Sequence, residues 1–158
     1  FPTRRSSDLS ASVAKLATLY YVEKQIQNNT ITANDKLKYI DAENNRRKEI
    51  ANRYISEIKN PNIILPENPS HTAEHVWHIF IIRIENREKL QNYLTENGVQ
   101  TLIHYPIPPH KQEAYKDWNN LSFPITEQIH NEVLSLPISP VMPEDEVSVV
   151  IELINTFS

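Results

Sequence analysis

Apolar residues recur at helical spacing in the first part of the chain. The stretch from Ser10 to about Asn28 is predicted to be helical, with Val13, Leu16, Ala17, Tyr20 and Tyr21 near i, i+3, i+4 and i+7 positions. A second helix, which Thr32 or Asn34 can cap, is predicted to run to about Lys59 and to stop at residues 60–62. Its middle, residues 41–48, is polar all round, which is typical of a helix that bridges two bodies or lies on a surface.

The pattern changes after Asn62 to short apolar runs. His75 to Ile84 is nearly continuous in apolar residues, which predicts a strand covered on both faces. Val99 to Ile103 predicts a second strand, and the alternation of Leu134, Leu136 and Ile138 predicts a third.

Three helices are expected between and after these runs. The first begins after Asn86 as its cap and ends at Asn97, where Gly98 supplies the left-handed residue past the end. The second is capped by Thr126 and runs to about Val133, and the third opens at Pro143, with its stripe at Val147, Val150, Ile151 and Ile154. From Asn62 onward the sequence therefore predicts an α+β domain with few strands and two or three covering helices.

Composition narrows the classes of function. The 158 residues carry 16 basic and 20 acidic side chains, a net charge of −4, which argues against nucleic acid or an anionic membrane as partner. The absence of cysteine excludes disulfides, thiolate metal sites and a cysteine nucleophile, and is compatible with the cytoplasm. The sequence has 1 glycine, against roughly 11 at average usage, so it has no glycine-rich phosphate loop.

The first nine residues, FPTRRSSDL, match the translation of a common sequencing adapter throughout their length. We expect residues 1–9 to be an artefact of that kind, and exclude them from the reasoning about the fold. A native segment upstream is then expected to be missing.

Three histidines, His71, His75 and His78, form the first candidate cluster. They could ligate zinc if they shared a helical face. The pattern instead predicts a strand entry, in which His75 and His78 point to opposite faces, so a metal site is not expected.

A long loop from His104 to Phe123 is the more informative candidate. His104, Tyr105 and His110 lie on a segment stiffened by prolines, and residues 112–117 allow a short helix. Such a rigid loop suits hydrogen bonding to hydroxyl or phosphate groups, although it could equally be a connector in which Tyr105 packs. Other groups are weaker candidates: residues 144–146 suit a helix N-terminus, Ser135 and Ser139 lack the glycines of a nucleophile elbow, and Arg46-Arg47-Lys48 suits a solvated helix face.

The second half of the chain resembles the DegT-type sugar-nucleotide aminotransferases, which are pyridoxal phosphate (PLP) enzymes of fold type I. The resemblance covers about residues 36–157. It is carried by the stretches HVWH (75–78), LQNYL (90–94), TLIHYPIPPHKQ (101–112), FPITE (123–127) and LSLPISP (134–140), with KLKYID (36–41) and RRKEIANRY (46–54) matching an inter-domain helix. The IHYPIPPHKQ stretch is most similar to the branch that aminates dTDP-linked 3-keto-6-deoxyhexoses.

The resemblance implies an architecture. Residues 10–33 would be a degenerate remnant of the large domain, 34–60 the inter-domain helix and 61–158 the C-terminal small α+β domain. The Schiff-base lysine, the aspartate that faces the pyridine nitrogen and most of the phosphate cup belong to the large domain, which is absent here. An asparagine motif expected near Thr30 to Asp35 is also missing.

The resemblance also implies a reaction. Glutamate would give its amino group, through PLP, to a nucleotide-linked keto-sugar in a cytoplasmic homodimer, in lipopolysaccharide or other glycan biosynthesis. The expected substrate-binding residues are His104, Tyr105 and His110: the first two would contact the sugar, and residues 106–110 would shape the loop. The chain alone is expected to bind no PLP and to be inactive. The alternative is a non-catalytic module for sugar-nucleotide binding or dimerisation. Exposed Leu16, Tyr20, Leu37 and Ile40 would favour oligomers.

Overall fold

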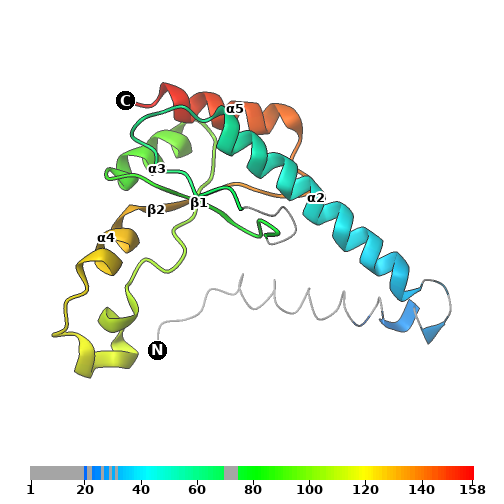
Figure 1. Ribbon diagram of the computed structural model, residues 1–158, viewed down its shortest axis with the longest axis horizontal. Helices are drawn as coiled ribbons and strands as arrows, with labels where there is room; N and C mark the ends of the chain where they lie inside the picture. Colours follow the sequence, from blue (N-terminus) through cyan, green and yellow to red (C-terminus); the bar gives the residue numbers. More distant parts are fainter. Residues whose placement is uncertain (1–19, 21–22, 26, 29, 31, 70–74) are drawn as a thin grey trace. The chain divides into compact units, whose positions relative to one another are not determined.

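The computed structural model describes residues 20, 23–25, 27–28, 30, 32–69 and 75–158 (Figure 1). It divides into two units, residues 1–42 and 43–158. The adapter-like segment and most of the helix predicted from Ser10 lie outside the described residues. Tyr20 is 63% exposed and Ile40 is 40% exposed, as the prediction of an uncovered apolar face requires; Leu16 and the Leu37 side chain are not described.

Helix α2 (Ala33–Glu57) confirms the long helix predicted up to the Asn60 stop. Its last turns enter the core through Ile50, Ala51 and Tyr54, all fully buried, so burial of one face fixes this end of the helix. The stop is built by Asn60, whose amide Nδ2 donates to the carbonyls of Ile154 and Phe157 at 2.7 and 2.8 Å. The end of α2 is thereby tied to the C-terminus of the chain.

The sheet of the described residues consists of two antiparallel strands, β1 (Phe80–Arg83) and β2 (Val133–Leu136), with Phe80 opposite Leu136 and Arg83 opposite Val133. The strand predicted from His75 is therefore too long at its N-terminal end. Trp77 has φ 51°, outside the extended region, and its N–H donates to Nδ1 of His75 at 2.9 Å, so the chain turns there before it can pair.

The strand predicted from Val99 to Ile103 is reduced to one bridge, between Leu102 and Ser135. Its neighbours are too polar and too exposed to continue the ladder, because Gln100 is exposed and the chain turns away at His104. The bridge still places the start of the His104 loop directly beside β2.

Three further helices complete the fold: α3 (Arg87–Glu96), α4 (Pro124–Glu132) and α5 (Glu144–Thr156). Gly98 follows α3 with φ 81°, which confirms its predicted left-handed role. Asn86 is the N-cap residue of α3, as predicted, although its side chain makes no capping hydrogen bond. The predicted cap at Thr126 was wrong: α4 begins at Pro124, two residues earlier, because proline is already set for the first helical position.

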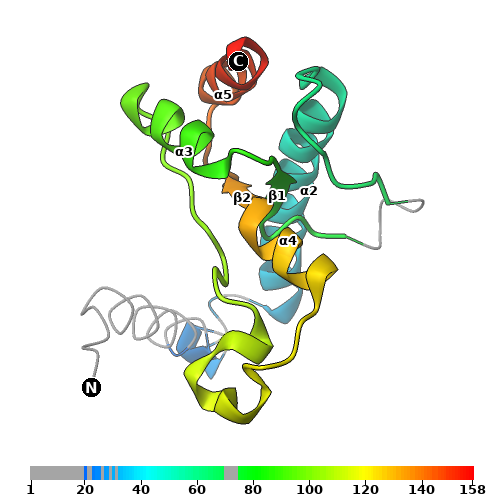
Figure 2. The same ribbon diagram turned by 90° about the vertical axis from the view of Figure 1, so that its left-hand side faces the viewer.

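The core lies where the strands meet α2, α3 and α5. In both views α3 and α5 lie above the two strands and α4 lies below them (Figures 1 and 2). Phe80, Ile82 and Leu134 from the strands are fully buried, and the predicted α5 stripe is confirmed, with Val147 and Ile154 at 0% exposure. Tyr54 closes this core against Phe80, ring centroids 5.0 Å apart, and donates its hydroxyl to the Pro137 carbonyl at 2.8 Å.

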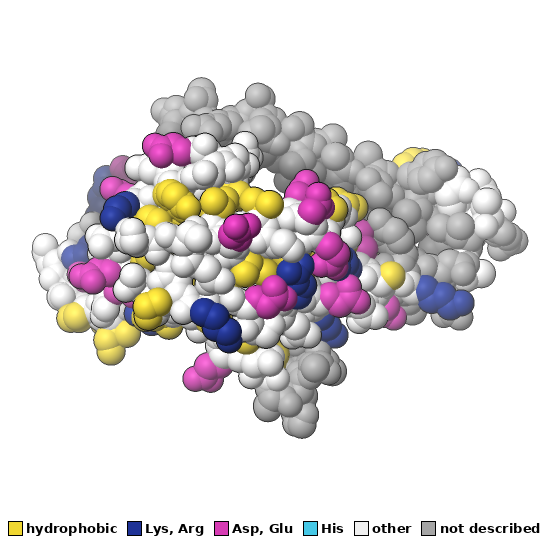
Figure 3. Space-filling view, turned by 90° about the horizontal axis from the view of Figure 1, so that it is seen from above, with side chains coloured by type: hydrophobic (Ala, Val, Ile, Leu, Met, Phe, Trp, Pro, Cys, Tyr) yellow, Lys and Arg dark blue, Asp and Glu magenta, His cyan; other side chains and the backbone are white. Residues whose placement is uncertain are grey.

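The outer surfaces of α2 and α5 are joined by an ionic cluster. Glu144, in the first turn of α5, accepts hydrogen bonds from both Arg46 and Arg53 of α2, and Arg46 also donates to the Met142 carbonyl at 2.8 Å. Basic and acidic side chains are interspersed on this face rather than gathered by sign (Figure 3). The guanidinium of Arg46, with that of Arg53, lowers the pKa of Glu144. Arg46 is therefore paired with Glu144 within the fold. In the part of the chain that is described, no helix has the length and apolar character to span a bilayer.

Candidate active-site loop

The candidate residues lie on the segment between the Leu102 bridge and α4. Two short 3-10 helices, η1 (Pro109–Lys111) and η2 (Glu113–Trp118), interrupt it, the second confirming the short helix expected near residues 112–117. The backbone N–H groups of Lys111 and Gln112 donate to the carbonyls of Pro108 and Pro109, at 2.9 and 3.2 Å. The loop is therefore ordered by local turns, as its prolines favour.

His104 begins the loop beside β2. Its Nδ1 is 2.7 Å from Oγ of Ser135, a side chain that is only 5% exposed. This contact leaves Nε2 as the ring nitrogen that a ligand can reach. His104 also lines an open cavity of about 620 Å³, together with His78, Ile79, Thr95, Gln100, Thr101, Leu102, Ser135, Leu136, Pro137, Ile138 and Ser139. Imidazole, hydroxyl and amide groups around one hollow suit a ligand with several hydroxyls.

Tyr105 is held in an unusual backbone conformation. Its φ is 56°, in the left-handed region that tyrosine rarely adopts, at a cost on the order of 1–3 kcal/mol. Its carbonyl accepts a hydrogen bond from Nδ1 of His130 at 2.6 Å. The side chain is 76% exposed and is not part of the cavity beside His104. The phenol is thus exposed to solvent. The connector interpretation required it to pack against the protein, which it does not.

His110 lies inside the loop, 4% exposed. Its Nε2 is 2.8 Å from Oε1 of Glu127, and its ring meets Phe123 edge-on with centroids 4.8 Å apart. The same Glu127 oxygen accepts the Phe123 N–H at 3.0 Å. Donation from the Phe123 backbone, followed by His110, lowers the pKa of Glu127, because both hydrogen bonds favour the carboxylate.

The structure therefore separates the three predicted residues. His104 faces a cavity, the Tyr105 ring stands exposed, and His110 is engaged within the loop. Sequence reasoning missed Ser135, Glu127 and His130, which hold these residues. The spacing of Glu127 and His130 by three along a predicted helix places them on one face, which is a visible signal, but the loop that this face meets is set by the fold.

Exposed apolar side chains accompany the loop. Tyr115 and Trp118 stack with ring centroids 5.2 Å apart, and each is about half exposed. Ile107, Leu121, Phe123 and Ile125 are exposed as well. This part of the molecule buries few of its own apolar groups, in contrast to the core.

The three histidines near residue 75 do not act as one cluster in the described residues. His71 lies outside the described residues, His75 is engaged with the Trp77 N–H, and His78 lines the cavity beside His104. Across the described ranges 32–69 and 75–158 and the few described positions before them, no group of three or more His, Cys, Asp or Glu residues suits a metal ion.

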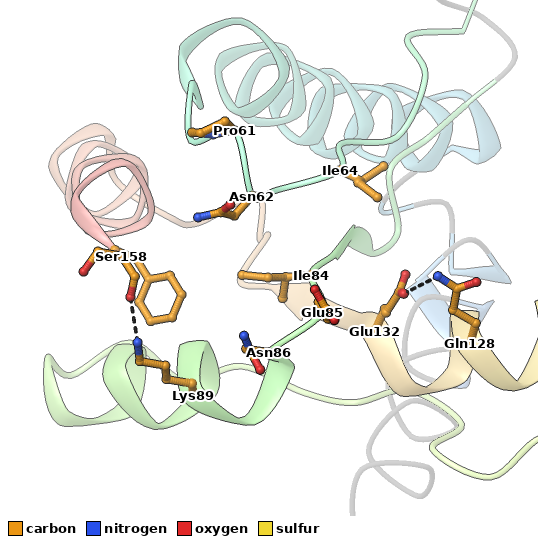
Figure 4. Close-up of a pocket in the computed structure, with 11 residues that line it drawn as sticks. Pro61, Asn62, Ile64, Ile84, Glu85, Asn86, Lys89, Gln128, Glu132 and Ser158 are labelled. Carbon is orange, nitrogen blue, oxygen red and sulfur yellow. Dashed lines mark hydrogen bonds between the residues drawn. The ribbon is translucent and has the colours of Figure 1, made fainter.

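A second pocket, of about 540 Å³, lies between residues 61–64, the segment that joins β1 to α3, helix α4 and the C-terminus (Figure 4). Lys89 lines it, but its Nζ donates to the Ser158 carbonyl at 2.8 Å, and Glu85 and Glu132 stand on the opposite side. A PLP site needs a lysine amine free for the cofactor and a cradle of donors for its phosphate. Carboxylates in the lining oppose a phosphate, so these residues do not fit that cofactor.

The described residues thus form an α+β unit, with a two-stranded sheet, covering helices and a loop that carries His104 and Tyr105. The model of the DegT/DnrJ/EryC1/StrS aminotransferase family matches residues 28–155, and the chain belongs to this family. A dTDP-3-amino-3,6-dideoxy-alpha-D-galactopyranose transaminase of Aneurinibacillus thermoaerophilus is 57% identical over 122 residues, which cover 77% of this chain and 33% of that enzyme.

Solved structures of sugar aminotransferases share the fold. DesV of S. venezuelae, in complex with a ketimine intermediate, is similar with a TM-score of 0.70 and 35% identity, covering 77% of this chain and 33% of that one. NtdA of Bacillus subtilis, with bound cofactor PMP, gives a TM-score of 0.64 and 34% identity, covering 71% and 27%. The chain spans about a third of the length of the relatives it matches.

Proposed function

We propose that this chain supplies the sugar-contacting part of a PLP-dependent transaminase that aminates a dTDP-linked 3-keto-6-deoxyhexose, with glutamate as amino donor. The observation that carries the proposal is the 57% identity to a dTDP-3-amino-3,6-dideoxy-galactose transaminase over a segment that includes the His104 loop. PMP, bound in the B. subtilis relative, is the aminated form of PLP, which supports the same cofactor for the complete enzyme.

The residues of this chain would bind and orient the sugar. Nε2 of His104 and the Tyr105 hydroxyl are two groups at consecutive positions that can each hydrogen-bond to a ligand. Because His104 lies at a cavity and Tyr105 is exposed, they suit two different hydroxyl or phosphate oxygens of one extended ligand. His110 would act within the loop, because its Nε2 is already engaged by Glu127. Orientation of the keto-sugar against the cofactor is the contribution that such contacts make to the rate.

PLP chemistry itself is assigned to residues outside this chain. We propose that residues 61–158 correspond to a C-terminal small domain, that the complete enzyme is a homodimer, and that residues 34–60 join its domains. The misfit of the Lys89 pocket to the cofactor supports the expectation that the 158-residue chain alone does not transaminate. Glutamate-dependent amino transfer to a dTDP-keto-sugar by the purified chain would overturn that expectation.

A chimaera tests the function directly. In the A. thermoaerophilus transaminase, the 122 matched residues are replaced by their equivalents from this chain. The chimaera is expected to retain transaminase activity on the dTDP-linked keto-sugar, and His104→Ala or Tyr105→Phe in it is expected to lower kcat/KM by roughly tenfold or more, the loss of a substrate hydrogen bond. A folded, PLP-loaded chimaera without activity on that substrate would contradict the proposal, as would unchanged kinetics in both variants.

A further inference from the structure

Helix α4 is anchored to the core at its C-terminal end. The Glu132 carboxylate accepts two hydrogen bonds from the Arg83 guanidinium of β1, at 3.0 and 2.7 Å. Next to it, Arg87 at the start of α3 donates from Nη1 to the His130 carbonyl at 2.6 Å, and the Ile84 N–H donates to the Glu132 carbonyl at 3.1 Å. The helix therefore follows the position of β1 and α3.

Two side chains of α4 contact the candidate loop, one near the start of the loop and one at His110 and Phe123. His130 donates from Nδ1 to the Tyr105 carbonyl, and Glu127 accepts from His110 and from the Phe123 N–H. Since residues three apart in a helix lie on one face, Glu127 and His130 form a pair of attachment points along α4. Residues 105 and 110 are thus fixed to one rigid element, which is itself fixed to the core.

Tyr105 is the residue for which such a restraint matters. Its left-handed φ of 56° is unfavourable for a tyrosine, so without an external partner the residue would relax toward the extended or right-handed region. The His130 hydrogen bond acts on the carbonyl of that residue. A change in the conformation of Tyr105 would redirect its ring and alter the adjoining His104.

We propose that Glu127 and His130 are positioning residues, which together clasp the loop 104–110 to α4 and so present His104 and Tyr105 to the nucleotide-linked sugar. Their role in presenting the sugar contacts rests on the proposed function, whereas the clasp itself is a property of the loop. Neither side chain needs to touch the substrate. The hydrogen-bonding atoms carry the effect: a donor at position 130 and an acceptor at position 127.

Paired substitutions in the full 158-residue chain separate this role from general stability. His130→Leu and Glu127→Leu remove the donor and the acceptor. His130→Asn keeps an N–H donor near the place of Nδ1, and Glu127→Gln keeps the accepting Oε1. Asn131→Leu, at an exposed position of the same helix, is the matched control. Thermal unfolding is recorded for each, so that a variant that does not fold is recognised and replaced in the comparison by His130→Ala or Glu127→Ala.

Loop conformation and ligand binding are read separately. Hydrogen exchange at the Lys111 and Gln112 amides and the Tyr105 Cα and Cβ chemical shifts report the loop, and titration with dTDP-3-amino-3,6-dideoxygalactose reports binding. Both Leu variants are expected to exchange roughly tenfold faster at these amides, to lose the left-handed shifts and to bind roughly tenfold more weakly. The conservative variants His130→Asn and Glu127→Gln, and the control Asn131→Leu, are expected to behave as the wild type.

The outcomes distinguish the clasp from the proposed function. Unchanged exchange, shifts and binding in the Leu variants overturn the clasp, as does equal damage in the Leu and the conservative variants. If the wild-type chain does not bind the probe, sugar binding by this chain fails, and exchange and shifts alone decide the clasp: loss in the Leu variants with recovery in Asn and Gln supports it, and unchanged data overturn it.

Discussion

The two-stranded core and the loop from His104 to Phe123 are held by different forces. Around β1 and β2, side chains such as Phe80, Ile82 and Leu134 are fully buried. Along the loop, Tyr105, Ile107 and Trp118 are mostly exposed. Order there comes from local backbone turns and from hydrogen bonds made by Ser135, His130 and Glu127. Apolar burial is non-directional and cumulative, whereas each hydrogen bond fixes one atom at one place.

If the loop carries the site proposed above, the difference implies that loop contacts can change at little cost to the stability of the core. We expect that removing a polar contact at the loop has little effect on the global free energy of unfolding but changes the orientation of Tyr105. In the core we expect the reverse: deleting a buried ring creates a cavity and lowers the free energy of unfolding, but it removes no hydrogen-bonding group from the loop.

Deleting a core ring is expected to have the largest effect. Phe80→Ala removes a fully buried side chain that packs on Tyr54 and Trp77, and is expected to lower the free energy of unfolding by about 3–5 kcal/mol, measured by urea titration. Phe123→Ala in the loop, where the ring is 47% exposed, is the comparison and is expected to cost less than about 1 kcal/mol. Equal losses at the two positions would contradict this difference between core and loop.

The anchor of α4 is expected to come next. Glu132→Leu removes the acceptor of Arg83 and Gln128 from a site that is 9% exposed, and leaves the guanidinium partly desolvated. We expect a loss of roughly 1–3 kcal/mol in thermal or urea unfolding. Glu96→Leu, on the exposed end of α3, is the control, and a similar loss there would show that the ion pair is not the cause.

A smaller effect is expected at Gly98. A Cβ at this position would meet nothing within 4 Å, so the cost of Gly98→Ala is conformational, from φ 81°, and is expected to be about 1–2 kcal/mol. Gly98→Asn is expected to recover part of it, because asparagine tolerates the left-handed region. An alanine variant as stable as the wild type would contradict the assigned backbone role.

The ionic cluster on the outer face is expected to act through pH. Arg46, with Arg53, lowers the pKa of Glu144 below its ordinary value of 4.5. A carboxyl with a lowered folded-state pKa stabilises the fold above its unfolded pKa, and this contribution is lost as pH falls through the folded value. Glu144→Gln is therefore expected to reduce the loss of stability on acidification below pH 4.5, seen in the pH dependence of thermal unfolding; Asp145→Asn is the control. An identical acid dependence in wild type and Glu144→Gln would contradict the cluster.

Local patterns predicted much of the framework. The long helix, the Gly98 turn, the α5 stripe and the short helix near Gln112 follow from spacing and from single residues with strong preferences. Strand ends did not follow, because Trp77 turns the chain through a contact with His75, and because the pairing of Leu102 depends on where β2 lies. Apolar content alone does not specify either.

The same limit applies to the arrangement of the candidate site residues. His104, Tyr105 and His110 were found as residue types on a stiff loop, but their separation was not, since it depends on Ser135, Glu127 and His130 from distant positions in the chain. A sequence shows which groups lie on one helix face; it does not show which loop that face will meet.

The central claim is that the loop beginning at His104 is where this chain meets a nucleotide-linked sugar. The most direct measurement is an amide and imidazole chemical-shift map of the 158-residue chain during titration with dTDP-3-amino-3,6-dideoxygalactose. We expect perturbations at His104, Tyr105 and the cavity residues Thr101 and Ser139, and none around Lys89 in the pocket of Figure 4. Saturating perturbations centred on Lys89, with His104 and Tyr105 unchanged, would contradict it.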